Sequence, residues 1–145
     1  MKLEGVFLYY DKENENGRIY TKEVAKNIIK QFNEINEGTV LGELGINEYN
    51  PGSEISLEDV SHQIKDLWID EEEQCIKGTI KVIDTNKGKL LETLMKSDAS
   101  FSIAPRGTGN VNSSTGEIEN YQLYSFDIIP TKQSSFKGPL KITDL

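Results

Sequence analysis

The sequence is poor in the side chains that most often bind metals or form covalent cross-links. Its 145 residues include one cysteine, Cys75, and one histidine, His62. A single cysteine excludes an intrachain disulfide and is typical of proteins in a reducing compartment. A zinc site needs three or four clustered ligands, and a calcium loop needs spaced oxygen ligands with a glycine. Neither pattern occurs, so we expect no metal and no cofactor.

A basic block and a long apolar run are also missing. The 16 Lys and Arg residues are interleaved with 24 Asp and Glu residues, which gives a formal net charge of −8. Phosphate binding draws on clustered Lys and Arg, so nucleic acid is not an expected partner. No segment approaches the length that spans a bilayer, and the N-terminal apolar run is too short for a signal peptide. A cytoplasmic protein without a membrane partner is expected.

The residues that are present predict one globular domain over 1–145. Hydrophobic residues make up 36% and charged residues 28%, enough for a core in a chain of this length. Runs rich in β-branched and aromatic residues predict strands, the third and fourth forming a hairpin around Glu71–Gln74, while 106–120 is expected to be a loop. The expected strands span 3–10, 39–45, 61–70, 75–84, 99–105 and 121–129.

Two stretches carry apolar residues at helical spacing. The first predicts a helix between an N-cap at Thr21 and a stop at Gly38, with Val24, Ala25, Ile28, Ile29, Phe32 and Ile35 on its apolar face. The second predicts a helix capped by Thr85, with Leu90, Leu91, Leu94 and Met95 facing inward. Ser56–Asp59 suggests one further helical turn. The fold class is therefore α+β, with a mostly antiparallel, barrel-like sheet and two or more helices. Residues 137–145 are either a tail or a docking segment.

Ser102 and His62 are the candidates for catalysis that the residues themselves suggest. A serine nucleophile needs a base within hydrogen-bond reach and donors for the oxyanion. His62 is the one imidazole available, and backbone amides near Arg106 and Gly107 could act as donors. The alternative is a strand serine and a half-buried, hydrogen-bonded histidine, which we favour because spacing alone does not bring the two together. Acidic neighbours of Cys75 oppose a lowered thiol pKa.

Six segments, in order along the chain, resemble motifs of one family. NGRIY at Asn16–Tyr20, followed by a helix, is similar to N-x-R-x-Y-P, and LGELG at Leu41–Gly45 is similar to G-E-L-x-H-P. VSHQIKDLWID resembles an S-H-x-I strand, and GTIKVIDTNKGKLLETLM resembles a strand with T-P-x-G-K and its helix. FSIAPRGTG resembles G-V-S-S-R-G-x-G, and FDIIPTKQSSF resembles D-I-V-x-x-P-S. The family is that of the prohead (head maturation) serine proteases of tailed bacteriophages, which share a fold with herpesvirus assembly proteases.

The resemblance implies that both reactive side chains have been replaced. The family nucleophile, the first serine of S-S-R-G, falls on Ala104, and the family histidine, which follows G-E-L-x, falls on Ile46. The rest of the motifs are retained. The retained residues are Gly42, Glu43, Leu44, Arg106, Gly107, Gly109 and Asp127. A serine hydrolase that lacks both nucleophile and base has no activated attacking group.

Three explanations follow from this pattern, in order of preference. The chain is a pseudoprotease, a prohead-protease-like structural or assembly protein that binds capsid, scaffold or portal proteins. Alternatively, it is a Ser→Ala variant of an active maturation endopeptidase, which would explain Ala104 but not Ile46. The third is a displaced site that uses Ser102 and His62. The first two place the protein in the host cytoplasm during assembly and in the virion head. The sequence does not decide whether the chain forms a homo-oligomer. A host-encoded or mobile-element protein with an unrelated role is a further alternative.

Overall fold

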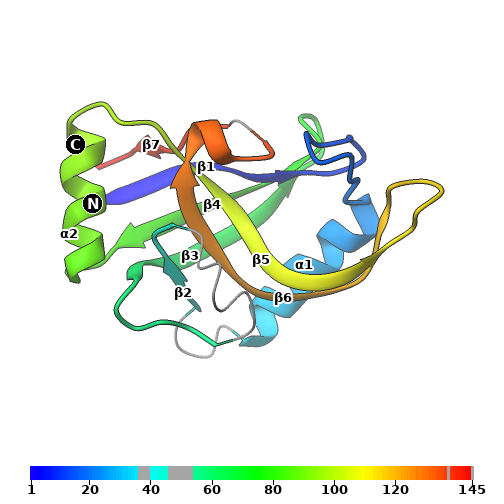
Figure 1. Ribbon diagram of the computed structural model, residues 1–145, viewed down its shortest axis with the longest axis horizontal. Coiled ribbons are helices and arrows are strands. Elements are labelled where there is room, and N and C mark those ends of the chain that lie inside the picture. The colour runs from blue at the N-terminus through cyan, green and yellow to red at the C-terminus, as the bar shows by residue number, and fades with distance from the viewer. Residues whose placement is uncertain (36–39, 46–53, 137, 145) are drawn as a thin grey trace.

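The computed structural model describes residues 1–35, 40–45, 54–136 and 138–144. It confirms an α+β fold in which all ladders between the named strands are antiparallel (Figure 1). In this part of the chain no helix has the length and apolar character needed to cross a membrane. The elements are β1 (Lys2–Tyr9), α1 (Lys22–Ile35), β2 (Val40–Glu43), β3 (Val60–Asp70), β4 (Cys75–Val82), α2 (Asn86–Lys96), β5 (Phe101–Val111), β6 (Ile118–Pro130), a short 3-10 helix (Thr131–Gln133) and β7 (Lys141–Ile142).

The strands form a barrel-like series that is not closed. A five-stranded sheet has the order β2-β3-β4-β1-β7, and β5 pairs with β6 in a second sheet. The two sheets meet where Leu44, just after β2, bridges Ile128 of β6, and where the Gly45 N–H donates to the Ile128 carbonyl at 2.7 Å. β5 therefore lies at one end of the series, with β1 and β7 at the other.

We call the opening between β5 and β1 the seam. The C-terminal segment crosses it, because the Leu140 N–H donates to the Phe101 carbonyl of β5 at 2.8 Å while β7 pairs with Leu3 and Glu4 of β1. The Leu140 side chain is buried and faces Gly5, where there is no side chain to displace it. The two ends of the sheet are thus connected by residues that follow β6.

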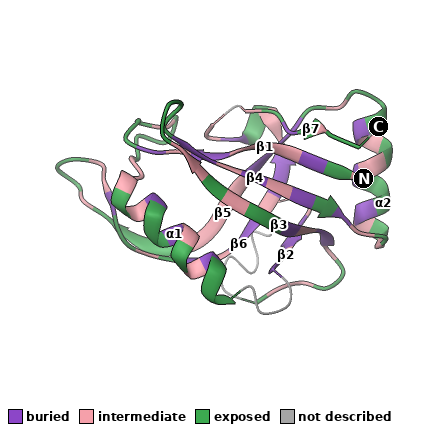
Figure 2. Ribbon diagram, turned by 180° about the vertical axis from the view of Figure 1, so that it is seen from behind, coloured by how far each residue is buried: buried purple, intermediate pink, exposed green. Residues whose placement is uncertain are grey.

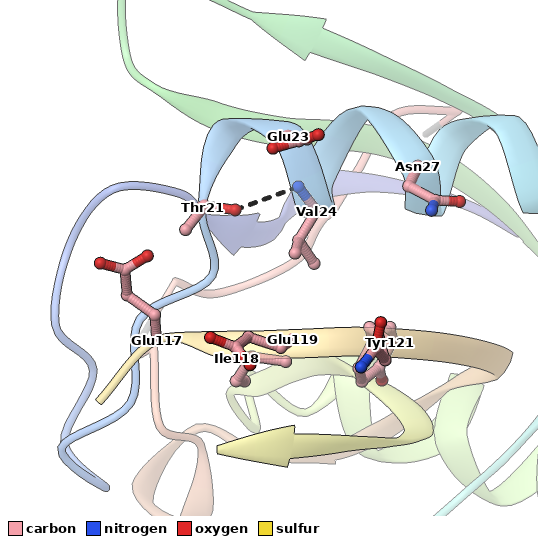
Figure 3. A pocket seen from close by; sticks show the side chains of 9 residues that line it. Thr21, Glu23, Val24, Asn27, Glu117, Ile118, Glu119 and Tyr121 are labelled. Carbon is pink, nitrogen blue, oxygen red and sulfur yellow. Dashed lines mark hydrogen bonds between the residues drawn. The ribbon is translucent and has the colours of Figure 1, made fainter. Parts of the chain in front are cut away.

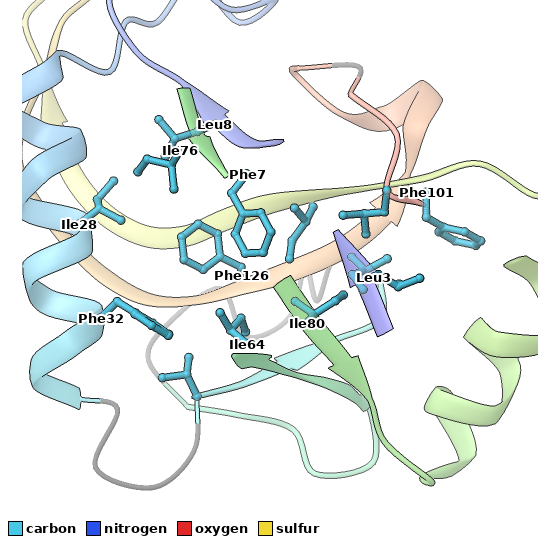
Figure 4. Packing of buried hydrophobic residues seen from close by; sticks show 14 of the residues in the cluster. Leu3, Phe7, Leu8, Ile28, Phe32, Ile64, Ile76, Ile80, Phe101 and Phe126 are labelled. Atoms are coloured by element: carbon cyan, nitrogen blue, oxygen red, sulfur yellow. The ribbon is translucent and has the colours of Figure 1, made fainter. Parts of the chain in front are cut away.

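The core fills the space between the sheets and α1 (Figure 4). Phe7 of β1 and Phe126 of β6 meet edge to face with ring centroids 5.0 Å apart, which ties one sheet to the other. Gly78 in β4 leaves room for this packing, since a Cβ there would come within 2.8 Å of the Phe7 ring. Beyond Ile64, β3 consists of exposed and half-buried residues, whereas buried residues recur along β4 (Figure 2).

Both predicted helices form, with the predicted caps. The Thr21 hydroxyl accepts from the Val24 N–H at 3.2 Å, and the Thr85 hydroxyl accepts from the Gly88 N–H at 3.0 Å. The stop at Gly38 lies outside the described residues. Leu90 was expected to face inward, but it is 45% exposed, because α2 lies at one end of the sheet and buries a single stripe through Leu91 and Met95 (Figure 2).

Two local predictions were wrong. The expected loop 106–120 is mostly strand, because β5 continues to Val111 and β6 begins at Ile118. Gly107 belongs to the ladder, since a Cβ there would clash with the Gln122 carbonyl of β6, so this glycine reflects close strand pairing. Ser56–Asp59 is a hydrogen-bonded turn and not a helical one, closed by the Asp59 N–H to the Ser56 carbonyl at 3.0 Å.

Candidate functional site: a cavity at the free edge of β5

β5 presents alternate backbone groups to β6 and to the seam. Ile103 faces Ile128, and Pro105 faces Phe126, in the β5–β6 register. The Ile128 carbonyl accepts from Gly45, and the Phe126 carbonyl accepts from His62, both on the side away from β5. In an antiparallel ladder such residues form the pairs without mutual hydrogen bonds. The backbone groups of Ile103 and Pro105 therefore point away from β6, toward the seam.

A cavity of about 180 Å³ lies at this edge. It brings together three segments whose motifs resemble those of the family: part of NGRIY, the centre of FSIAPRG, and the SSF that follows β6. A hydrogen bond from the Glu15 N–H to the Ser135 carbonyl, 3.4 Å long, links two of its walls. The lining residues are Phe7, Asn14, Asn16, Arg18, Tyr20, Ile103, Ala104, Pro105, Ser134, Ser135 and Phe136. Ala104, the position to which the resemblance assigns the family nucleophile, is among these lining residues and has no reactive side-chain atom. Ile46 lies outside the described residues.

The retained acidic and basic residues form one ion cluster beside Ala104. Ala104 pairs in register with Asp127, which accepts from Arg106 Nε at 2.8 Å. Arg106 Nη2 lies 3.1 Å from Glu43 Oε2, and Arg106 Nη1 donates to the Glu54 carbonyl at 3.1 Å. The cluster thus connects β5, β6, β2 and the segment that precedes β3.

Burial makes this ion cluster a framework for the site. The side chains of Arg106, Glu43 and Asp127 are 11%, 3% and 14% exposed. The Glu43 N–H also donates to Asp127 Oδ1 at 3.0 Å, so backbone and side chain reinforce the same junction. Charges removed from water are stable only when they are paired and hydrogen-bonded, and removal of one partner is costly. These residues therefore hold β2, β5 and β6 in fixed positions relative to one another.

His62 is fully buried and both of its ring nitrogens are engaged. Nε2 donates to the Phe126 carbonyl at 2.8 Å, which leaves Nδ1 to accept from the Ser61 hydroxyl at 2.8 Å. The ring lies against Gly42, its cross-strand neighbour, where any Cβ would clash with the imidazole. The retained glycine of LGELG and the histidine of VSHQI therefore pack against each other.

The Ser61 hydroxyl and the His62 ring are hydrogen-bonded, as a serine nucleophile and its base would be. Their surroundings, however, are not those of an active site. Both residues are 0% exposed, and neither lines the cavity beside Ala104. Burial lowers the pKa of His62 to about 4, although its bond to the Phe126 carbonyl opposes that shift. A buried imidazole with both nitrogens engaged is a structural group.

Ser102 is likewise held by other partners. Its hydroxyl donates to Thr131 Oγ1 at 3.1 Å, and Thr131 Oγ1 also pairs with the Ser100 hydroxyl at 2.7 Å. Ser102 is 0% exposed and lies outside the cavity lining. The structure brings Glu43, Arg106 and Asp127 together as the retained motifs suggest, whereas Ser102 and His62 each have separate partners.

A second concavity, of about 420 Å³, lies between the start of α1 and β6 (Figure 3). Glu23, Glu117 and Glu119 give it an acidic lining. Over the described ranges, no group of three or more His, Cys, Asp or Glu side chains is arranged to hold a metal ion. None of the candidate residues named from the sequence lines this concavity.

The sequence did not indicate which residues would contact Ser102 and His62. Ser61 contacts His62, Thr131 contacts Ser102, and Pro105 borders the cavity, and the sequence did not predict these three roles. A serine next to the histidine, and a threonine after the last strand, are common patterns without a specific signal. NGRIY, SSF and the segment around Ala104 all resemble motifs of the same family. Their proximity in the structure could therefore have been anticipated from the sequence.

Comparisons with known proteins support the family resemblance. The sequence model described as prohead core protein serine protease matches residues 1–130. Among solved structures, the capsid assembly protease of bacteriophage T4 is similar in fold, with a TM-score of 0.75, 24% sequence identity, and coverage of 88% of this chain and 80% of that chain. No curated protein matches this sequence. The match over most of its length shows that the chain belongs to the prohead core protein serine protease family.

Proposed function

We propose that this chain is a catalytically inactive member of its family that holds extended segments of phage head proteins in the cavity beside Ala104. The observation that carries the proposal is that Ala104, which has no reactive side-chain atom, lines the cavity where the family resemblance requires a serine. The histidine position is also replaced, by Ile46. Loss of nucleophile and base together removes the activated attacking group.

The other candidate groups do not support a replacement mechanism. The Ser102 hydroxyl is bonded to Thr131, and His62 is bonded to Ser61 and Phe126. A base must come within hydrogen-bond reach of the proton that it removes. Both residues are buried and outside the cavity lining, so a substrate at Ala104 would reach neither.

The edge of β5 is suited to binding a peptide in an extended conformation. Ile103 directs an N–H and a carbonyl toward the seam, and the cavity beside it offers space for a side chain. Strand addition uses main-chain hydrogen bonds for affinity and pockets for alternate side chains. Without a nucleophile, such a site would hold a segment of a capsid, scaffold or portal protein without cutting it.

The rival function is an active maturation endopeptidase of which this chain is a Ser→Ala form. The intact Arg106–Glu43–Asp127 cluster is compatible with either function, because it fixes strands and does not react. Ile46 favours the inactive form, since one substitution at the nucleophile suffices to stop the reaction.

The two functions separate in one experiment on the purified protein. It is incubated with a fluorophosphonate probe and, in parallel, with the scaffold protein of the same phage. We expect no covalent labelling and no cleavage, together with co-sedimentation of the scaffold protein. Labelling or specific cleavage would refute the inactive form. Recovery of the chain from purified virions by mass spectrometry tests the proposed location in the head, and its absence from both proheads and virions would contradict it.

A further inference from the structure

Among the described residues, no strand pairs with the outer edge of β5, and β6 is its one partner in the sheets. Between described residues, its only backbone hydrogen bond is the one from the Leu140 N–H to the Phe101 carbonyl. Beyond Phe101, the residues whose backbone points to the seam are Ile103 and Pro105, as their register with Ile128 and Phe126 requires. An open edge of this kind is a template for pairing with another extended segment.

Gly107 continues the same edge. Its partner in register is Leu123, whose N–H donates to Gln31 Oε1 of α1 at 2.8 Å and therefore points away from β5. Gly107 then directs its own N–H and carbonyl outward, as Ile103 does. The edge presents two complete donor and acceptor pairs, at Ile103 and Gly107, with Pro105 midway between them.

Proline interrupts that pattern because it has no N–H. At position 105 an added strand finds a carbonyl to accept its N–H, but no donor for its own carbonyl. The family resemblance places the second serine of S-S-R-G here, which would supply that donor. Pro105 is thus a further departure from the S-S-R-G motif, next to Ala104, and it changes the backbone of the edge rather than a side chain.

We propose that Pro105 sets the strength with which the β5 edge holds an extended peptide. This inference rests on the proposed function. A bound head-protein segment pairs with Ile103 and with Gly107 but lacks one hydrogen bond at the centre, beside the cavity. The missing bond leaves one peptide carbonyl without a partner, which weakens the ladder and keeps the segment exchangeable.

The test uses overlapping 12-residue peptides that tile the scaffold, capsid and portal proteins of the same phage. Their dissociation constants are measured for the natural protein, for Pro105→Ala and for Pro105→Ser. Both variants restore an N–H at the seam and should bind the tightest peptide about three- to tenfold more strongly. Pro130→Ala is the matched control, because Pro130 lies at the end of β6, outside the cavity lining, and its substitution should change affinity less than twofold.

A second readout locates the effect. On peptide binding, the amide introduced at position 105 by Pro105→Ala should shift downfield in NMR spectra and exchange more slowly with solvent. Equal affinities for all four proteins, or tighter binding without protection of that amide, would overturn the role of Pro105 alone. If no peptide binds any of the proteins, the proposed holding function fails, and the role of Pro105 fails with it.

Discussion

Arg106 of β5 and Asp127 of β6 are joined by a 2.8 Å hydrogen bond from Nε to Oδ2, directly beside the backbone pair of Ala104 and Asp127. The guanidinium extends from there to Glu43 of β2. The strands around Ala104 are therefore held together by buried charges. These three residues of the family motifs therefore contribute to the fold itself.

Substitution of Arg106 by leucine should destabilise the protein strongly. It leaves the Glu43 and Asp127 carboxylates buried without their cation, which we expect to cost about 3 to 5 kcal/mol in the free energy of unfolding. Urea denaturation followed by circular dichroism measures the change. Lys96→Ala is the control, because it removes an exposed pair with Glu92 and should cost less than about 0.5 kcal/mol. A loss below 1 kcal/mol for Arg106→Leu would show that the cluster is not a framework.

Gly42→Ala should be among the more disruptive small substitutions. A Cβ at this position would clash with the His62 ring and with the Phe126 carbonyl, so one of them must move and their hydrogen bond is lost. We expect a cost of roughly 3 kcal/mol. Gly138→Ala is the matched control, since its Cβ would meet only Val6 at an ordinary 3.8 Å. Similar midpoints of thermal unfolding for the two variants would argue against tight packing at Gly42.

His62 predicts how stability depends on pH. Its folded-state pKa of about 4 lies below the ordinary value of 6.5, so between these values the unfolded chain binds a proton that the folded chain does not. The contribution is fully present above pH 6.5 and is lost as the pH falls toward 4, by about 3 kcal/mol in total. The chain has one histidine, so His62→Gln should flatten this part of the profile. A wild-type stability that stays constant from pH 7 to pH 4.5 would refute the assignment.

Restoring one reactive residue should not restore reactivity. Ala104→Ser supplies a hydroxyl without a base, and Ile46→His supplies a base without a nucleophile, so neither single variant should react with a fluorophosphonate probe above background. Only the double substitution is expected to label. Labelling of the Ala104→Ser variant alone would mean that another group acts as the base, and a Ser102→Ala control would exclude labelling at that serine.

Leu140 should contribute to stability as a core residue would. It is 4% exposed and packs across the seam against Gly5, so Leu140→Ala should cost about 2 to 4 kcal/mol. Leu57→Ala is the control, because Leu57 is 74% exposed and its truncation should be nearly neutral. Equal denaturation midpoints for these two variants would show that the C-terminal segment is not part of the folded unit.

The sequence allowed the elements to be predicted better than their junctions. Helical spacing and the Thr21 and Thr85 caps are local signals, and both helices form where they indicate. Gly107 misled the prediction because glycine marks loops and close strand pairing alike, and only the register with β6 separates the two. The partners of His62 and Ser102 come from residues such as Phe126 and Thr131, which the antiparallel register places beside them. No local pattern carries that information.

The seam has a consequence for how this fold can change over time. A strand in the middle of a sheet is hydrogen-bonded to a neighbouring strand on each side. A substitution that alters its backbone therefore disturbs two ladders. Ala104 and Pro105 belong to a strand with a paired neighbour on one side only, and the amide that proline lacks would have pointed to the seam. A substitution at either position therefore disturbs one ladder and leaves the rest of the sheet as it is.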